Sequence, residues 1–87
     1  MAWIIEIGRQ AEKDLGKLAN VDGKRIAATM TAIAALNNPR DRGIAMTGQW
    51  AGHWRYRIGD YRVIARIEDQ RLVIVVVAIG HRREVYR

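Results

Sequence analysis

The fold follows from a ten-residue stretch in the last third of the chain, Trp54-Arg55-Tyr56-Arg57-Ile58-Gly59-Asp60-Tyr61-Arg62-Val63. On both sides of Gly59-Asp60, apolar or aromatic residues alternate with arginine, which is typical of two strands joined by a tight turn. A two-residue turn fixes the register of the strands and places Arg57 opposite Arg62. Because opposed like charges destabilise paired strands, this arrangement indicates a partner that carries negative charge.

The sequence before the hairpin predicts one strand and two helices. Apolar residues recur at strand spacing over residues 3–7 and at helix spacing over residues 9–18 and 23–36. Asp22 is the predicted N-cap of the second helix, which ends before Pro39. The predicted fold is a small α+β domain spanning residues 1–87, in the order β-α-α-β-β-β. We expect the two N-terminal helices to pack on one face of a mainly antiparallel sheet.

The last predicted strand, Leu72 to Ile79, is apolar at every position. Such a run is typical of a strand that is covered on both faces or has a partner on its second face. A tight turn at Asp69-Gln70 would pair Arg62 with Val77, so the chain would leave this strand beside the first hairpin. The second face, where we expect exposed apolar surface for a protein partner, comprises Val73, Val75, Val77 and Ile79. The connection at residues 39–52 is predicted to contain a short extended piece near residues 44–46.

The charge of the chain favours a nucleic acid as the anionic partner. The formal net charge is +6, and all eight cations within residues 51–87 are arginine. A guanidinium group can hold a phosphate at two points, whereas the ammonium group of lysine is a point charge. A basic surface that serves solubility alone is the alternative.

Composition argues against several other kinds of site. The chain has no cysteine and only two histidines, His53 and His81, so we expect no metal site, no thiol chemistry and no cofactor. The N-terminal residues do not resemble a signal peptide, and the longest apolar run is too short to span a membrane as a helix. We therefore expect a cytoplasmic protein with no membrane partner.

Several candidate site residues converge at one end of the predicted sheet. His81 follows the last strand and is the candidate general base, because histidine ordinarily titrates near neutral pH; a hydrogen-bonding role is the alternative. Tyr86 lies beyond the strand and could stack on a nucleobase or take part in proton transfer. The candidate phosphate contacts are Arg55, Arg57, Arg62 and Arg82.

Four segments carry a resemblance to a known family: Arg9-Gln10-Ala11-Glu12-Lys13-Asp14-Leu15, Leu36-Asn37-Asn38-Pro39, Tyr56-Arg57-Ile58-Gly59-Asp60-Tyr61-Arg62-Val63 and Gly80-His81-Arg82-Arg83-Glu84-Val85-Tyr86. They resemble the RelE/ParE superfamily of toxins from bacterial and archaeal toxin-antitoxin systems, and the last segment is similar to the RelE-like pattern. The resemblance implies a RelE-like fold and a cognate antitoxin that forms a hetero-oligomer with the toxin.

The RelE-like branch implies an endoribonuclease that needs no metal, cuts mRNA on the ribosome and thereby inhibits translation. In this chemistry a ribose 2′-hydroxyl attacks the adjacent phosphate. By position, the resemblance implies that Arg62 and Arg82 stabilise the scissile phosphate and that Tyr86 stacks on a base. With Arg57 as a further stabiliser and His81 as the candidate base, the predicted catalytic set is Arg57, Arg62, His81, Arg82 and Tyr86. The RNA and its phosphates would be bound by Arg55, Arg57, Arg62, Arg82 and Arg83.

Two other functions stay open at this point. A ParE-like toxin would share the scaffold but inhibit DNA gyrase without nuclease activity, and a basic nucleic-acid-binding module would have neither activity. Well-known RelE members have lysines, one of them the proposed base, where this chain has Arg55 and Arg57. Because arginine holds its proton too tightly to act as a base, either His81 takes that role or the nuclease is weak or inactive.

Overall fold

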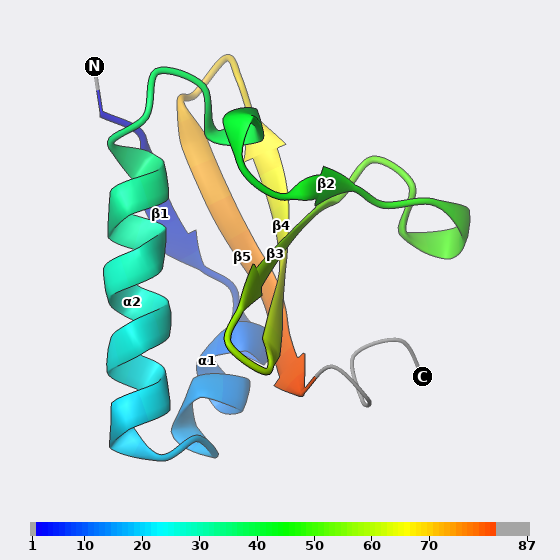
Figure 1. Ribbon diagram of the computed structural model, residues 1–87. Coiled ribbons are helices and arrows are strands. Elements are labelled where there is room, and N and C mark those ends of the chain that lie inside the picture. Colours follow the sequence, from blue (N-terminus) through cyan, green and yellow to red (C-terminus); the bar gives the residue numbers. More distant parts are fainter. Residues whose placement is uncertain (1, 82–87) are drawn as a thin grey trace.

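Residues 2–81, the part of the chain that this computed structural model describes, form a five-stranded mixed sheet with two helices (Figure 1). The elements are β1 (Ile4–Ile7), α1 (Arg9–Gly16), α2 (Asn20–Ala34), the 3-10 turn η1 (Pro39–Asp41), β2 (Ile44–Ala45), the 3-10 turn η2 (Gly48–Trp50), β3 (Trp54–Ile58), β4 (Tyr61–Glu68) and β5 (Val73–His81). The strand order is β1-β5-β4-β3-β2, with β1 parallel to β5 and the other neighbours antiparallel. The predicted α+β fold is confirmed, and the short extended piece near residues 44–46 is β2.

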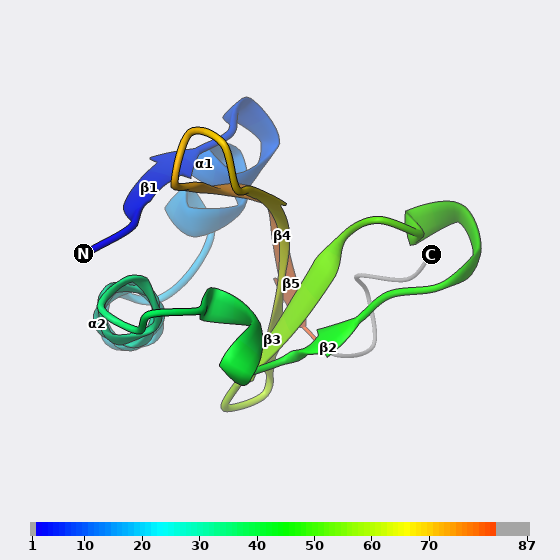
Figure 2. The same cartoon turned by 90° about the horizontal axis from the view of Figure 1, so that it is seen from above.

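The two helices cover one face of the sheet, which we call the helix face. Helix α2 lies along β1 and β3, and α1 packs against β5 (Figures 1 and 2). The core between helices and sheet contains Ala11 of α1 and Ile26, Met30 and Ile33 of α2, each at most 3% exposed. Burying one large aliphatic side chain contributes about 1.5–3 kcal/mol, so these buried residues stabilise the packing of the helices on the sheet.

Helix α2 begins three residues earlier than predicted. Ala19 occupies the N-cap position without a side-chain hydrogen bond, and Asp22 lies inside the first turn. The prediction that Asp22 caps this helix was therefore wrong. A carboxylate in the first turn still interacts favourably with the helix dipole. Gly23, taken as the first helical residue, is accommodated inside the helix at a cost of about 1 kcal/mol, which packing of α2 on the sheet offsets.

The register of the first hairpin matches the prediction at every pair. Arg57 pairs with Arg62, and the flanking pairs are Arg55 with Ile64, Tyr56 with Val63 and Ile58 with Tyr61. Gly59 has a φ of 59°, which residues with a side chain rarely adopt, so the sequence Gly-Asp suits this turn.

The second turn differs from the prediction. It comprises four residues, 69–72, in place of two, and Leu72 adopts a φ of 53°. A bulge between Ile64 and Ala65 also leaves Val77 without a direct partner on β4. The turn is two residues longer than predicted and the bulge adds one more residue, so the register of β5 shifts by three. The partner of Arg62 is therefore Gly80 in place of the predicted Val77, and Tyr61 pairs with His81.

The prediction of an exposed apolar face on β5 was wrong. Val73, Val75 and Ile79 are 3%, 9% and 5% exposed, respectively, and Val77 is half-buried. Because a bulge reverses the alternation of side chains, Ile79 belongs to the core under the helices. The large apolar side chains that are exposed among the described residues are Ile4, Ile7, Val21 and Ile44.

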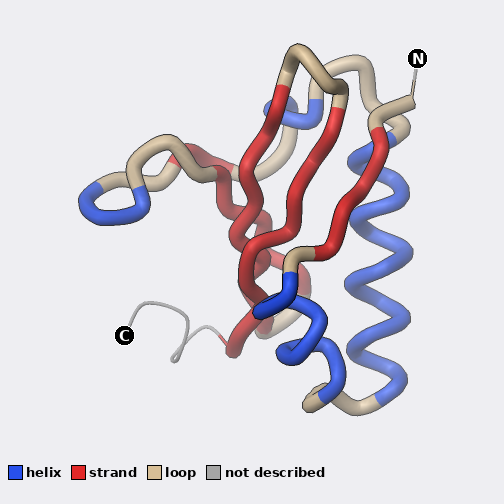
Figure 3. The backbone as a smooth tube through the Cα atoms, turned by 180° about the vertical axis from the view of Figure 1, so that it is seen from behind, coloured by secondary structure: helices blue, strands red, loops and turns tan. Residues whose placement is uncertain are grey.

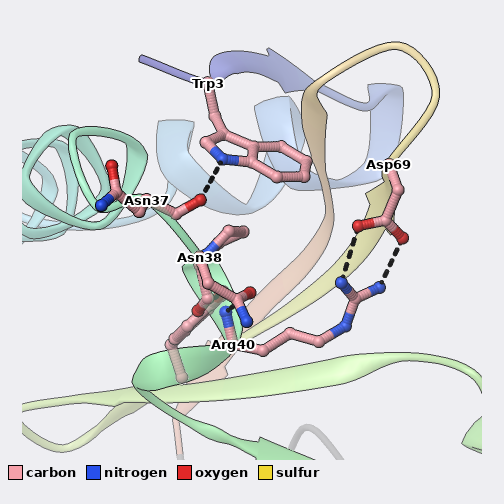
Figure 4. Close-up of polar contacts among 7 residues, drawn as sticks. Trp3, Asn37, Asn38, Arg40 and Asp69 are labelled. Atoms are coloured by element: carbon pink, nitrogen blue, oxygen red, sulfur yellow. Dashed lines mark hydrogen bonds and ion pairs between the residues drawn. The ribbon is translucent and has the colours of Figure 1, made fainter. Parts of the chain in front are cut away.

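Polar contacts tie the end of the sheet that lies away from the first hairpin (Figure 4). The guanidinium group of Arg40 donates two hydrogen bonds to the Asp69 carboxylate, at 2.8 and 2.9 Å, and so joins η1 to the β4–β5 turn. Asn38 accepts a hydrogen bond from the Arg40 backbone at 2.9 Å, and the Trp3 indole donates to the Asn37 carbonyl at 3.2 Å. These bonds tie the connection between α2 and β2 to the start of the chain and to the β4–β5 turn.

Candidate nucleic-acid interface

Alternation along β3 and β4 separates a buried set of side chains from an arginine set. Tyr56 and Ile58 of β3 and Val63 of β4 lie in the core and are at most 4% exposed, with Tyr61 packed against them. Arg55 and Arg57 of β3, together with Arg62 of β4, therefore lie on the opposite face. We call the surface of Arg55, Arg57 and Arg62 the arginine row.

The buried half of the hairpin fixes the arginine row in space. The Tyr56 hydroxyl donates a hydrogen bond to the Pro39 carbonyl at 2.8 Å, within the core. Burial raises the pKa of Tyr56 to about 12, so this phenol stays protonated and keeps donating at neutral pH. Trp54 donates through its indole to the Arg42 carbonyl at 2.6 Å. Both anchors restrain the strand that carries Arg55 and Arg57.

The three arginines differ in exposure. Arg57 is exposed, whereas Arg55 and Arg62 are half-buried. Two positions along a strand correspond to about 7 Å, so Arg55 and Arg57 can contact successive groups of an extended polyanion, and Arg62 is directly opposite Arg57. The row can therefore surround one phosphate with two guanidinium groups and hold a neighbouring phosphate with a third.

Two arginines away from the first hairpin contact acidic residues. Arg71 contacts Glu68 at 2.6 Å and Glu6 at 2.8 Å, and Arg66 contacts Glu68 at 3.1 Å. Arg71, followed by Arg66, lowers the pKa of Glu68 by hydrogen bonding. Arg66 lies on the same strand and the same face as Arg62, near the other end, and so provides a natural comparison for the arginine row.

His81 lies at the same end of the sheet as the arginine row but on the helix face. It pairs with Tyr61, and the two rings meet edge to face at 83° with their centres 5.9 Å apart. A hollow of about 400 Å³ beside His81 is also lined by Asp14 and Lys17 of α1. The structure thus brings Arg55, Arg57 and Arg62 together on one face and places the His81 ring on the other.

Three residues of the predicted site, Arg82, Arg83 and Tyr86, lie outside the described residues. Their predicted roles therefore stay predictions. The last described residue, His81, ends β5 opposite Tyr61 of the first hairpin.

Sequence reasoning did not place Trp50, which lies next to the arginine row. Residues 46–53 form a loop that projects from the edge of the sheet, on the side away from α2 (Figures 1 and 3). Within it, η2 brings Trp50 near a hollow of about 230 Å³ that Arg55 also lines. The available signal was an aromatic residue between two glycines, Gly48 and Gly52, in a basic chain, but that pattern does not reveal which neighbour the aromatic ring will have.

Two kinds of site are not found in the part of the chain described. Among residues 2–81, no three His, Cys, Asp or Glu side chains gather as a metal site would require. None of the helices within those residues has the length and apolar character needed to span a membrane. The arginine row offers guanidinium groups, and these can stabilise the negative charge that develops on a phosphate during a reaction.

Comparisons with known proteins agree with this geometry. A family model described as the ParE toxin of the type II toxin-antitoxin system parDE matches residues 5–86. The chain is also similar to a curated protein, toxin RelG of Mycobacterium tuberculosis, with 29% identity over 100% of this chain and 99% of that protein.

Two solved toxin-antitoxin complexes contain chains of similar structure. One is the RelBE2 complex of Mycobacterium tuberculosis, with 26% identity, a TM-score of 0.73 and coverage of 97% of this chain and 95% of the other. The second is an archaeal RelE-RelB complex from Pyrococcus horikoshii, with 25% identity, a TM-score of 0.74 and coverage of 98% and 100%, respectively. Both relatives extend over nearly the whole chain, including the hairpin and β5.

Proposed function

The chain belongs to the family of ParE toxins of type II toxin-antitoxin systems, within the RelE/ParE superfamily, and we propose that it cuts ribosome-bound mRNA as a metal-independent endoribonuclease. Its similarity to toxin RelG and to a chain of the RelBE2 complex supports this proposal. The observation that carries the proposal is the direct pairing of Arg57 with Arg62 on the face away from the helices. Opposed guanidinium groups repel each other, and a phosphate between them would contact both. Translation would stop because the message is cut.

The proposed reaction is transfer of the phosphate within the RNA chain. The 2′-oxygen of one ribose attacks the adjacent phosphorus, and the bond from phosphorus to the 5′-oxygen of the next nucleotide breaks. The 2′-hydroxyl proton passes to a base, the departing 5′-oxygen gains a proton, and a 2′,3′-cyclic phosphate results. Arg57 and Arg62 would stabilise the additional negative charge of the transition state, and Arg55 would hold the neighbouring phosphate. Arg82, Arg83 and Tyr86 would complete the site.

His81 is the proposed base. In the free protein its ring packs on Tyr61, one residue beyond the Gly80 that pairs with Arg62. The proposal therefore requires the ring to turn from the helix face towards the arginine row when RNA binds. His81→Ala should lower the cleavage rate while RNA binding is retained. A full rate in that variant would remove His81 from the mechanism and leave the role of the arginines intact.

The proposed partners are the ribosome with its mRNA and a cognate antitoxin. The two similar solved chains were crystallised with antitoxins, which supports a hetero-oligomeric complex for this chain too. The ribosome places the site of action in the cytoplasm. Co-expression of the neighbouring gene should yield a complex that co-purifies with the toxin and restores growth.

A ParE-like gyrase inhibitor is the second candidate, and the description of the matching family favours it. The two candidates differ in which polymer is damaged first. After pulse expression, the nuclease predicts cut transcripts and arrested translation within minutes, with intact DNA. The gyrase inhibitor predicts double-strand breaks and a DNA damage response while translation continues. Intact mRNA during growth arrest would refute the nuclease proposal.

A further inference from the structure

The loop that carries Trp50 has features of a ligand site that the phosphate chemistry does not require. We propose that the hollow lined by Ile44, Ala45, Met46, Thr47, Trp50 and Arg55 binds one nucleobase of the single-stranded RNA that the arginine row holds. The inference rests on the proposed function, because it assigns a base-binding position to the same substrate.

The composition of the hollow suits a flat aromatic ring with polar edges. Trp50 offers an indole and Met46 a polarisable thioether, while Thr47 and Arg55 supply hydrogen-bonding groups. The volume of about 230 Å³ is below the roughly 300–1,000 Å³ of pockets for drug-sized ligands, so it suits one ring system better than a whole nucleotide. Stacking on an aromatic ring with a nearby arginine is how proteins commonly hold single-stranded nucleic acid.

The loop holds Trp50 in place before any ligand arrives. Backbone hydrogen bonds run from Trp50 to Thr47 at 3.3 Å, from His53 to Trp50 at 3.0 Å and from Met46 to His53 at 3.0 Å. The rings of Trp50 and His53 also meet at 90° with centres 5.4 Å apart. Because little side-chain and loop freedom is left to lose, a base can bind here without a large ordering cost.

Trp50 is not explained as a core residue. It is half-buried and outside the cluster that the helices cover, in a loop that projects from the sheet (Figure 3). Ile44 on the rim of the same hollow is 51% exposed. Apolar groups gathered at a projecting edge indicate contact with a partner molecule.

The position of the hollow favours RNA over a protein strand as its occupant. Strand β2 has only two residues, Ile44 and Ala45, which is too short an edge to receive a partner strand. Arg55 lines the hollow and also belongs to the arginine row, so a base in the hollow is continuous with a phosphate bound by the row. The formal net charge of the chain is +6 and Arg55 lines the hollow, which suits a negatively charged RNA.

The test uses the purified full-length chain labelled with 5-fluorotryptophan and a nine-nucleotide RNA whose riboses are 2′-O-methylated. This RNA cannot be cut, so binding is read without catalysis. Trp50→Phe and Trp3→Phe identify the fluorine signals. We expect the RNA to shift the Trp50 signal and leave that of Trp3, which lies near the far end of the sheet, unchanged (Figure 4). An abasic chain with the same phosphates should leave both signals unchanged.

Affinities separate base binding from phosphate binding. Trp50→Ala should weaken RNA binding at least about 10-fold and alter abasic-chain binding less than about twofold, whereas Arg62→Ala should weaken both. Trp50→Phe, which keeps an aromatic ring, should retain most of the affinity and serves if the alanine variant fails to fold. A Trp50 signal that does not move at saturating RNA, or that moves equally with the abasic chain, would overturn the proposal. So would a signal that responds to the antitoxin and not to RNA.

Failure of this inference can be told from failure of the proposed function. If ribosome-bound mRNA is cut but RNA does not change the fluorine signal of Trp50, base binding in the hollow is refuted and the proposed nuclease activity stands. If RNA moves the Trp50 signal but no mRNA is cut, the nuclease is refuted and the hollow stands.

Discussion

The two faces of the β3–β4 hairpin are built from the same strands, yet they differ in what their side chains contact. On the helix face, Tyr56, Ile58 and Val63 are buried under α2 and hold the sheet in shape. On the other face, Arg55, Arg57 and Arg62 lie side by side, with Arg57 directly opposite Arg62. Alternation along the strands places the core residues on one face and the arginine row on the other. We therefore expect substitutions on the two faces to have separable effects on stability and on function.

Arg57→Gln should give the largest effect on function. Loss of one guanidinium group that faces the reacting phosphate should lower the rate of mRNA cleavage by about 100-fold or more. The same change should leave the free energy of unfolding unaltered or raise it by about 0.2–1 kcal/mol, because the repulsion with Arg62 is relieved. Cleavage assays and urea unfolding measure the two. Arg57→Lys, which keeps the charge, is the control, and a parallel loss of stability in Arg57→Gln would contradict the separation of faces.

Ile33→Ala should give the largest effect on stability. Ile33 is fully buried in α2, and removal of a buried isoleucine to alanine costs about 2–5 kcal/mol. Ile4→Ala is the matched control, because Ile4 is 62% exposed and should lose well under 1 kcal/mol. Urea unfolding curves followed by circular dichroism compare the two. Equal losses would mean that the core does not lie under the helices.

Gly43→Ala should displace β3, the strand that carries both core residues and the arginine row. Gly43 has a φ of 77°, and an added Cβ would meet the Arg55 carbonyl, the Trp54 indole and the Tyr56 ring. We expect a loss of about 2 kcal/mol or more, together with weaker binding of RNA as β3 shifts. Gly48→Ala is the control, since its φ of 64° is also positive but no atom lies within 4 Å of the new Cβ. A variant of Gly43 as stable as that of Gly48 would refute the close approach.

Tyr56→Phe should cost about 1 kcal/mol, because the Pro39 carbonyl loses its hydrogen bond. The pKa of Tyr56 is raised to about 12 by burial, so its stabilising effect is complete below the ordinary value of 10.0 and is lost as the pH rises through about 12. Stability measured between pH 8 and pH 12 should therefore fall in the wild type, and more steeply than in Tyr56→Phe. Identical profiles would show that this phenol is not buried.

Asp69→Asn should give the smallest effect, since the carboxylate is on the surface. Hydrogen bonding from Arg40 lowers the pKa of Asp69, so the stabilisation is present above the ordinary value of 3.8 and is lost as the pH falls through the lowered one. The melting temperature of the variant should be slightly lower than that of wild type at pH 7 and equal to it near pH 2. A difference that persists in acid would mean that the contribution is not ionic.

The first hairpin was predictable because its register depends on two adjacent residues, Gly59 and Asp60. The register of β5 was not, because Leu72 with a positive φ and a bulge at Val77 are outcomes of packing that no local pattern announces. The shifted register of β5 matters for the site. Because of it, His81 lies within the sheet opposite Tyr61, with its ring on the helix face.

The hollow beside Trp50 was also beyond the reach of sequence reasoning. Its walls come from β2, the 46–53 loop and Arg55, which meet only because Ile44 and Ala45 pair with β3. A two-residue strand has too little periodicity to be assigned a register from sequence. By contrast, the pairing of Arg57 with Arg62 follows from the two-residue turn at Gly59-Asp60 and was predicted correctly.

The central claim is that the arginine row binds the scissile phosphate of ribosome-bound mRNA. Its most direct test is the rate of cleavage in a reconstituted ribosome complex for wild type, Arg62→Ala and Arg66→Ala. Arg66 lies on the same strand and face but pairs with Glu68, away from the hairpin. We predict a loss of at least about 100-fold for Arg62→Ala and a change of less than about threefold for Arg66→Ala. Equal rates for the two variants, or no cleavage by the wild type, would contradict the claim.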